Sequence, residues 1–444
     1  MGNGNSMLRV AAVLVAAGQL ASGGPYSGAL NDPTNPFDAP VPGFIGSHGA
    51  GKARLVTGFD VEGVPLINNP DNFVQPLFFA WADEVVDYAP SELVTADFND
   101  PYYALSRVTG DNWDVVSLGD MSAQAITNGD PPGTITLRFI KPIFDLAGAD
   151  FVIFENALIA ETSQLGAVVG QVFGELAYVE VSADGENFTR FPSESLTAAA
   201  VGGYGSINAT NVRNLAGKHS NAGGECWGTP FDLAELGLSE IQYIRLVDIP
   251  GTGAFTDSVG RPIYDPHKTF GSGGFDLEAV GAISVGMTYA EWPQLETLAA
   301  DQRGEADDAD GDGIVNLLEY AFARVPGFPD DVENLPLCRL IDVVGQAHAA
   351  IEFVRDERLV DLIYEVQASP SLAESDWTTI ARSAGGGPVL AVSGHSPVIS
   401  EISASPLASI GVLRKVLLRD GLPVSSNSKR FFRVKIFITP PSQS

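Results

Sequence analysis

A twelve-residue stretch, DADGDGIVNLLE from Asp308 to Glu319, constrains this chain more than any other segment, and we call it the acidic loop. Aspartates occupy its positions 1, 3 and 5, so the carboxylates of Asp308, Asp310 and Asp312 can converge on one point. Gly313, at position 6, permits a sharp turn directly after them. This spacing is typical of a loop that wraps around a cation.

The second half of the acidic loop completes a set of oxygen donors. Ile314 at position 7 offers its backbone carbonyl, Asn316 at position 9 binds directly or through water, and Glu319 at position 12 supplies two oxygens. A solvated acidic linker is the alternative, but it would not also supply the glycine, the apolar Val315 and the glutamate in register. The sequence therefore predicts a Ca²⁺ site formed by Asp308, Asp310, Asp312, Ile314, Asn316 and Glu319.

Short apolar runs separated by turn residues fill the chain from about residue 44 to 285. In TITLRFI, the side chains of Ile135, Leu137 and Phe139 alternate with more polar ones, which predicts a half-buried strand. Similar runs stand at residues 77–81, 151–154, 176–181, 241–247 and 277–283. Because no long amphipathic helix interrupts them, the pattern favours an all-β sandwich.

The last third of the chain changes from helical to strand patterns. Residues 289–300 carry apolar side chains at three-residue spacing and predict a helix, and a second helix follows the acidic loop. Strand patterns then return over residues 334–439. We therefore expect a mainly β protein, with two β-sandwich domains joined by a short helix–calcium loop–helix. The expected parts are a signal peptide (1–23), a first sandwich (24–286), the joint (287–332), a second sandwich (333–439) and a disordered tail (440–444).

The net charge of −30 helps to predict the partners and the location of the protein. Residues 1–332 hold 44 acidic and 14 basic side chains, whereas residues 333–444 hold 11 of each. Such an acidic surface disfavours nucleic acid and anionic lipid, and it suits divalent cations or a salty environment. Arg9 before a short apolar run and Ala21 among small residues predict a secretory signal. We expect a secreted or cell-surface bacterial protein with no membrane span.

Nucleophilic and zinc chemistry have little support in the sequence. Cys226 with His219 and His267 loosely suggests a thiol protease, but the spacing differs from that of known nucleophile segments. The five histidines are scattered without ligand spacing, so a zinc hydrolase has no support. Cys226 and Cys338 fall in different expected domains, and we expect no disulfide between them.

Acidic residues near strand ends leave more than one interpretation open. They are Asp150, Glu155, Glu175, Glu180, Asp265, Asp276 and Glu278. Glycoside hydrolysis requires two carboxylates about 5–10 Å apart, a separation that sequence does not give. Turn residues, or ligands of a second calcium ion, are the simpler interpretation. Asp276 and Glu278 alternate with apolar residues, so they share one face of a strand, either towards solvent or at a metal site.

Several strings resemble known families. GADFVIFEN, ELAYVEVSADGENFTRFP and GSGGFDLEAVGAI resemble a family of bacterial secreted cell-surface proteins of unassigned activity. The hairpin VEVSADGENFTRF followed by IQYIRLVD is similar to discoidin or galactose-binding-like sandwiches, which implies glycan or surface binding through loops. EADDADGDGIVNLLEYAF resembles EF-hand, dockerin and thrombospondin type 3 calcium loops and a C-terminal region of exported proteins of Verrucomicrobia-like bacteria. Dockerins have two such loops and this chain has one, so the resemblance does not imply cohesin binding.

The sequence thus predicts an exported, calcium-binding, non-catalytic protein whose first β domain binds glycan or another cell-surface component. Calcium would rigidify the joint between the two domains. The alternative is a secreted polysaccharide-active hydrolase or lyase with an accessory C-terminal β domain.

Overall fold

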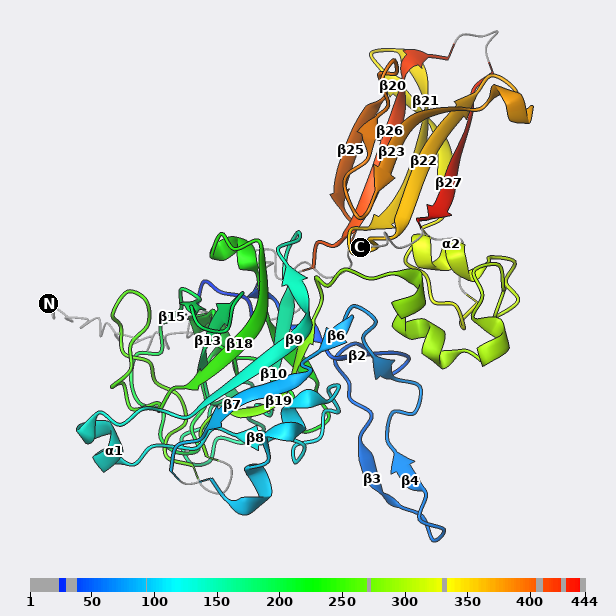
Figure 1. Ribbon diagram of the computed structural model, residues 1–444. Coiled ribbons are helices and arrows are strands. Elements are labelled where there is room, and N and C mark those ends of the chain that lie inside the picture. The colour runs from blue at the N-terminus through cyan, green and yellow to red at the C-terminus, as the bar shows by residue number, and fades with distance from the viewer. Residues whose placement is uncertain are drawn as a thin grey trace, which may run out of the picture.

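The computed structural model of this chain describes residues 24–28, 38–92, 94–269, 273–329, 334–404, 410–424 and 429–439. These residues are mainly β structure arranged in several antiparallel sheets, which confirms the mainly β prediction. The C-terminal sheets stand apart from the earlier ones, and the joint lies at their base (Figure 1). The predicted signal peptide and C-terminal tail lie outside the described residues.

The first sheet gathers strands from distant parts of the chain. It contains β1 (Val41–Pro42), β6 (Ala80–Trp81), β8 (Val116–Ser117), β10 (Phe151–Glu155), β17 (Trp227–Phe231) and β19 (Asp276–Ala282). The order is β1-β17-β10-β19-β6, and β8 also pairs with β19. Strands β10 and β19 are buried along their whole length, because both faces of this sheet are covered.

The second sheet shares a core with the first. It contains β7 (Glu84–Ala89), β9 (Thr134–Phe144), β13 (Ala177–Ser182), β14 (Thr189–Arg190) and β18 (Glu240–Asp248), in the order β14-β13-β18-β9-β7. Ile135, Leu137 and Phe139 on β9 are fully buried, as the alternation in the sequence predicted. They belong to one hydrophobic cluster with Phe151 and Val280 of the first sheet. The two sheets therefore bury their apolar side chains together.

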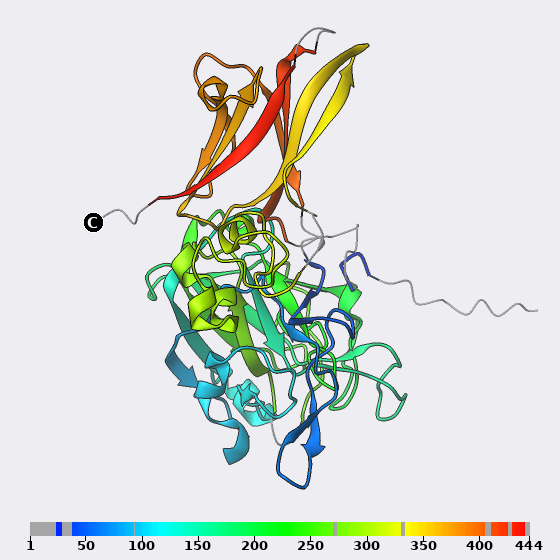
Figure 2. The same cartoon turned by 90° about the vertical axis from the view of Figure 1, so that its right-hand side faces the viewer.

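Short hairpins and helices complete the first region, residues 24–286. The hairpins pair β2 (Phe44–Ile45) with β5 (Phe73–Val74), β3 (Val56–Phe59) with β4 (Pro65–Ile67), β11 (Leu158–Ile159) with β12 (Val172–Phe173), and β15 (Glu194–Ser195) with β16 (Val212–Arg213). The helices are α1 (Ala123–Asn128) and the 3₁₀ turns η2 (Ala96–Phe98), η3 (Pro101–Leu105), η4 (Ala209–Asn211) and η5 (Leu233–Glu235). The β3–β4 hairpin extends away from the sheets in both views (Figure 1 and Figure 2).

The C-terminal region forms two sheets of four strands each. One has the order β20 (Leu337–Val343), β21 (Gln346–Asp356), β26 (Leu413–Pro423) and β25 (Val398–Ser403). The other has the order β24 (Leu390–Ala391), β23 (Thr378–Ala384), β22 (Leu362–Ser369) and β27 (Phe431–Ile438), with η9 (Glu374–Asp376) between β22 and β23. Ile351, Val366, Ile380 and Val416 from both sheets share one core, and Figure 2 shows these strands above the first region.

The joint differs from the predicted pair of helices. The prediction of one helix over residues 289–300 is wrong, because this segment forms 3₁₀ turns η6 (Tyr289–Glu291), η7 (Pro293–Thr297) and η8 (Ala300–Gln302). Pro293 explains the break: the residue before a proline is driven out of the helical region, and Trp292 has ψ 114°. The last four residues of the acidic loop, 316–319, form the start of the short helix α2 (Asn316–Ala321).

Hydrogen bonds attach the joint to the C-terminal strands. The carboxylate of Asp361 accepts a hydrogen bond from the backbone N of Tyr289 at 2.7 Å and another from the hydroxyl of Tyr320 at 3.0 Å. Trp292 and Leu295, the apolar stripe expected of a helix, are buried in the same core as β21 and β22. The joint and the C-terminal sheets therefore share one hydrophobic core.

An arginine links the C-terminal region to the first region. Arg358 forms a buried ion pair with Asp356, and its Nη1 donates to the backbone carbonyl of Leu77 at 2.7 Å. Its guanidinium lies 3.4 Å from the centre of the Phe79 ring. Because Arg358 is almost fully buried, these contacts hold the two regions in a defined relation.

Candidate functional site

The acidic loop brings three of its predicted ligands together. One carboxylate oxygen each from Asp308, Asp310 and Asp312 lies within 4.8 Å of the other two. Loop amides orient these groups: the N of Gly311 donates to Asp308 Oδ1 at 2.8 Å, and the N of Gly313 donates to Asp308 Oδ2 at 3.0 Å. The glycines have φ of +79° and +92°, which glycine adopts at little cost, so the chain can turn tightly around the carboxylates.

One cation of the protein stands beside these carboxylates. Arg324 Nη2 lies 3.1 Å from Asp312 Oδ2, and the Arg324 side chain is almost fully buried. Asp310 Oδ2 is buried and accepts no hydrogen bond from the described residues. Three carboxylates this close repel one another, and a single guanidinium neutralises only one of them. The loop therefore keeps a negative, oxygen-lined surface that suits a hard cation.

The other three predicted ligands are arranged differently. Ile314 follows Gly313 in the loop, two residues after Asp312. The Nδ2 of Asn316 donates to the carbonyl oxygens of Gln302 at 2.8 Å and Gly304 at 3.0 Å, so this side chain ties α2 to the preceding turn. Glu319 lies in α2, is fully buried, and is outside the group of three converging carboxylates. The roles of Ile314, Asn316 and Glu319 as ligands stay predictions.

A groove of about 950 Å³ lies between the first region and the joint. Its aromatic lining consists of Phe44, Phe73, Phe78, Phe79, Trp81 and Phe328. Its charged lining residues are Arg54, Asp71 and Arg107, and Pro293 and Val325 of the joint also line it. A hollow of this size with apolar walls and a few polar groups is typical of a ligand site. Sequence reasoning missed the groove, because its residues come from separate segments without a shared motif.

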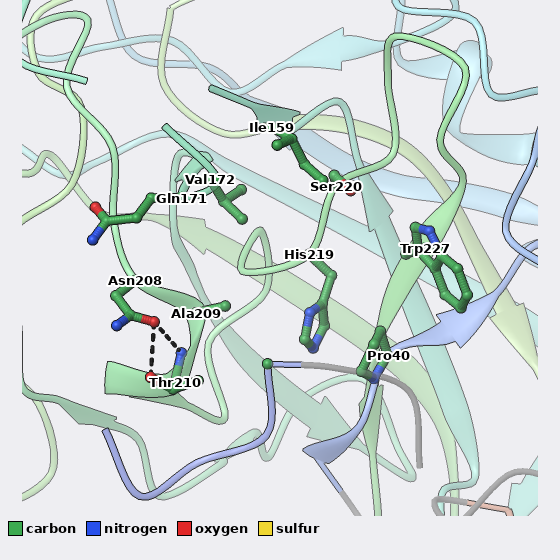
Figure 3. A pocket seen from close by; sticks show the side chains of 12 residues that line it. Pro40, Ile159, Gln171, Val172, Asn208, Ala209, Thr210, His219, Ser220 and Trp227 are labelled. Atoms are coloured by element: carbon green, nitrogen blue, oxygen red, sulfur yellow. Dashed lines mark hydrogen bonds between the residues drawn. The ribbon is translucent and has the colours of Figure 1, made fainter. Parts of the chain in front are cut away.

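A second hollow, of about 490 Å³, is lined by segments of the first region around His219 (Figure 3). The His219 Nε2 lies 3.3 Å from the carbonyl oxygen of Asp38, and burial lowers the pKa of His219, which keeps the ring neutral. Asn208 Oδ1 accepts hydrogen bonds from the backbone N and the hydroxyl of Thr210, as the dashed lines show. Among the residues that the structure describes, no carboxylate or thiol lines this hollow, so none of them is a partner for acid–base chemistry at His219.

The thiol protease suggested by Cys226 finds no support in the geometry. Cys226 is fully buried in an apolar cluster, and burial raises the pKa of its thiol well above the usual value. The hydrogen bonds of His219 and His267 go to Asp38 and Asp120 rather than to the thiol. A neutral, buried thiol is a packing group and not a nucleophile. Both cysteines are free, as expected.

Buried carboxylates of the first region are braced by hydrogen bonds in two places. Glu278 Oε1 accepts from the N of Thr109, the hydroxyl of Thr109 and the N of Gly110, while Asn221 donates to its Oε2. Burial raises the pKa of Glu278 to about 7. Asp276 and Glu278 are both buried, so the interpretation that their face meets solvent is wrong.

Asp150 is braced in a similar way. Its Oδ1 accepts from the N of Leu146 at 3.0 Å and its Oδ2 from the N of Leu233 at 2.7 Å, and burial raises its pKa to about 8. Asp145 and Asp232 stand close to it, but hydrogen bonds from backbone N–H groups account for both oxygens of Asp150.

The remaining candidate carboxylates are also removed from solvent. Glu180 forms ion pairs with Arg190 and Arg245 on the second sheet. Glu155 and Glu175 are buried near Asp276, and Asp265 is buried near Asp248. Because buried carboxylates cannot reach a polymer in solution, these positions are poor candidates for glycoside hydrolysis.

No protein-family model matches the chain, and no curated protein matches it at a significant level. Within the described residues, no helix has the length and apolar character needed to cross a bilayer.

Proposed function

We propose that this protein binds calcium through the acidic loop and that the ion fixes α2 and the joint against the C-terminal sheets. The observation that carries the proposal is the convergence of the Asp308, Asp310 and Asp312 carboxylates within 4.8 Å. Without a cation these groups repel one another, which loosens the loop. With the ion bound, the loop holds α2, and the Tyr320 hydroxyl of α2 reaches Asp361 at the base of the C-terminal strands.

The proposal includes export to the cell exterior or surface. Calcium sites in extracellular modules bind with dissociation constants of about 10⁻⁴–10⁻³ M, so such a site fills outside the cell and empties in a cytoplasm. The strongly acidic composition and the predicted secretory signal support this location. The joint would then become rigid only after export.

The first region supplies the binding activity in this proposal, with a glycan or another cell-surface component as ligand. The aromatic groove supports it, because flat rings such as Phe73 and Trp81 offer stacking surface and Arg54 and Asp71 offer polar contacts. Asp71 is the one carboxylate among the described lining residues, whereas glycoside hydrolysis requires two. This favours binding over the hydrolase or lyase alternative.

Calcium titration tests the loop. Isothermal titration of the full chain should give a site of about 10⁻⁴–10⁻³ M. The variant Asp310→Ala should lose it, and Asp301→Asn, which removes an exposed charge nearby, should keep it. Calcium should also slow proteolysis of residues 300–325 in the wild type and not in Asp310→Ala. Equal calcium affinities of the wild type and Asp310→Ala would contradict the proposal.

Glycan retention tests the groove. The full chain would be passed over immobilised bacterial and algal polysaccharides, with and without calcium, and both retention and released sugars would be recorded. Retention that Trp81→Ala abolishes, without release of sugars, is the expected result. Because Pro293 and Val325 of the joint line the groove, removing calcium should weaken retention. Release of oligosaccharides would favour the hydrolase or lyase instead.

A further inference from the structure

Six buried acidic side chains lie at one end of the first two sheets, away from the acidic loop. This buried carboxylate cluster consists of Asp120, Glu155, Glu175, Asp248, Asp265 and Asp276. None of the six exposes more than 4% of its surface. Carboxylates are rarely buried without a partner. Six of them in one place therefore need an explanation.

Strand ends bring the cluster together. Glu155 is the last residue of β10 and Asp276 is the first of β19, its neighbour in the first sheet. Asp248 is the last residue of β18, and it pairs with Ala177, the first residue of β13. Glu175 precedes that strand by two residues. Both sheets therefore deliver carboxylates to the same end of the shared core.

Shared hydrogen-bond donors show how closely these groups approach. The Thr269 hydroxyl donates to Glu175 Oε1 at 2.6 Å and lies 3.3 Å from Asp120 Oδ2. The N of Gly274 donates to Glu175 Oε1 at 3.1 Å, and the next amide along the chain donates to Asp248 Oδ1 at 2.8 Å. Two consecutive backbone amides therefore donate to two carboxylates, one from the segment before β13 and one from β18.

Two oxygens of the cluster are left without a donor. Glu155 Oε2 and Asp248 Oδ2 are buried and have no hydrogen-bond partner among the described residues. Glu278, two residues along β19 from the cluster, has donors at both oxygens, so the fold does satisfy a buried carboxylate where no other ligand is needed. Within the described part of the chain, Glu155, Glu175, Asp248 and Asp265 form no ion pair with lysine or arginine.

Ionisation of these carboxyl groups is disfavoured as a result. Burial first, and then neighbouring carboxylates, raise the pKa values of Glu155, Glu175, Asp248 and Asp265 well above their ordinary values. The charge of Asp276 contributes to the raised pKa values of Glu155, Glu175 and Asp248. A cation at this point would satisfy the open oxygens and offset the repulsion.

Two glycines lie against the cluster, at positions where a Cβ would come too close to its atoms. A Cβ on Gly217 would stand 3.4 Å from Glu155 Oε2 and 2.0 Å from the carbonyl oxygen of Glu175. A Cβ on Gly274 would stand 2.9 Å from Asp248 Oδ1. Both have positive φ, +89° and +76°, which glycine adopts readily. The backbone thus approaches the carboxylates closely.

We propose that the buried carboxylate cluster binds a calcium ion, which draws Glu155, Asp248 and Asp276 together as its ligands. Within the described residues, no three carboxylates of the cluster have oxygens that all lie within 4.8 Å of one another, so these side chains shift to reach one ion. Calcium takes six to eight oxygen ligands in variable geometry, whereas magnesium keeps several waters, for which a buried site has little room. The one nearby imidazole, of His267, is hydrogen-bonded through Nδ1 to Asp120 Oδ1 at 2.8 Å, so the site is lined by oxygen rather than nitrogen. This site is independent of the acidic loop.

The test uses the full chain with the acidic loop disabled by Asp308→Asn and Asp312→Asn. After gel filtration in calcium-free buffer, elemental analysis should find about one calcium per chain. Millimolar calcium should raise the Tm of the first region by about 5 °C or more over an EDTA-treated sample. A loop-disabled chain with no calcium and a Tm that calcium does not move would overturn the proposal, whatever the loop itself binds.

Matched variants locate the ion. Adding Asp248→Asn to the loop-disabled chain should remove the bound calcium, and Asp184→Asn, at an exposed turn of the same region, should leave it. Glu155→Gln serves in place of Asp248→Asn if the latter does not fold. Calcium retained by both cluster variants would contradict the assignment.

Discussion

The acidic loop and the buried carboxylate cluster collect acidic oxygens in opposite ways. The loop draws its three converging carboxylates from five consecutive residues, at the surface, with Arg324 as a resident cation. The cluster draws its carboxylates from residues 120–276, inside the first region, and among the described residues Oε2 of Glu155 and Oδ2 of Asp248 have no donor.

A bound cation therefore has a different effect in the acidic loop than in the buried carboxylate cluster. At the surface, water and Arg324 already screen the carboxylates, so an ion adds order to a loop that can exist without it. In the interior no water screens them, so an ion is part of the fold itself. We therefore expect a weak, reversible site in the loop and a tighter, structural site in the cluster.

The largest expected contrast comes from glycine substitutions. Gly217→Ala puts a Cβ 2.0 Å from the carbonyl oxygen of Glu175 at a positive φ, which should cost about 4 kcal/mol or prevent folding. Gly313→Ala also has a positive φ, but nothing lies within 4 Å of its Cβ, so it should cost about 1 kcal/mol. Urea unfolding of the two full-chain variants measures the difference. Equal costs would show that the cluster is loosely packed.

Removal of one carboxylate gives the next contrast. In the presence of calcium, Asp248→Asn should lower the free energy of unfolding of the first region by about 3 kcal/mol, because a ligand of a buried ion is lost. Asp310→Asn should lower that of the joint by about 1 kcal/mol, because its loop is screened by solvent. Calorimetry with and without EDTA measures both, and EDTA should erase each difference. A larger effect of Asp310→Asn would reverse the ranking.

The strands and the acidic loop were predictable because their signals are local. The alternation in TITLRFI marked the buried face of β9 that carries Ile135, Leu137 and Phe139. The aspartate spacing marked the three carboxylates that converge. The helix over residues 289–300 failed for a local reason too, since Pro293 breaks it into 3₁₀ turns and the apolar spacing alone does not show this.

The buried carboxylate cluster was not predictable as a site. Each member stands beside a strand end, where an acidic residue usually caps a turn, and only the pairing of β18 with β13 and of β10 with β19 brings them together. Asp248 was missed for this reason, at the end of the predicted strand IQYIRLV. Arg324 was missed because nothing in the spacing of the loop specifies a guanidinium beside Asp312.

Asp150 is a buried carboxylate that differs from the cluster, because each of its oxygens accepts a hydrogen bond from a backbone N–H group. Its folded pKa is raised to about 8, above the value in the unfolded chain, so the folded state keeps a proton that the unfolded state releases. Its contribution to stability is therefore complete below about pH 4 and is lost as the pH rises towards 8. We expect a loss of about 2 kcal/mol, limited by the two amides that stabilise the ionised form.

Unfolding of the wild type and Asp150→Asn between pH 4 and 8 measures this contribution. The variant should have the flatter pH profile, and the difference between the two profiles should not depend on calcium. A calcium-dependent difference would mean that Asp150 belongs to a metal site, against the hydrogen bonds that its oxygens accept.

The smallest expected effect concerns Arg324. Replacing it with glutamine removes the positive charge 3.1 Å from Asp312 Oδ2, so calcium should bind the loop about threefold more tightly. Arg382→Gln, on an exposed position of β23, should leave the affinity unchanged. Isothermal titration in low salt measures both constants. Weaker binding in Arg324→Gln would show that the guanidinium positions the loop rather than competing with the ion.

Anomalous diffraction from crystals of the full chain grown with calcium tests the two sites most directly. Long-wavelength data should show one peak among Asp308, Asp310 and Asp312 and a second peak between Glu155 and Asp248. The second peak should persist in crystals washed with calcium-free solution, while the first fades. Ordered side chains with no anomalous peak at either place would contradict calcium binding by this protein.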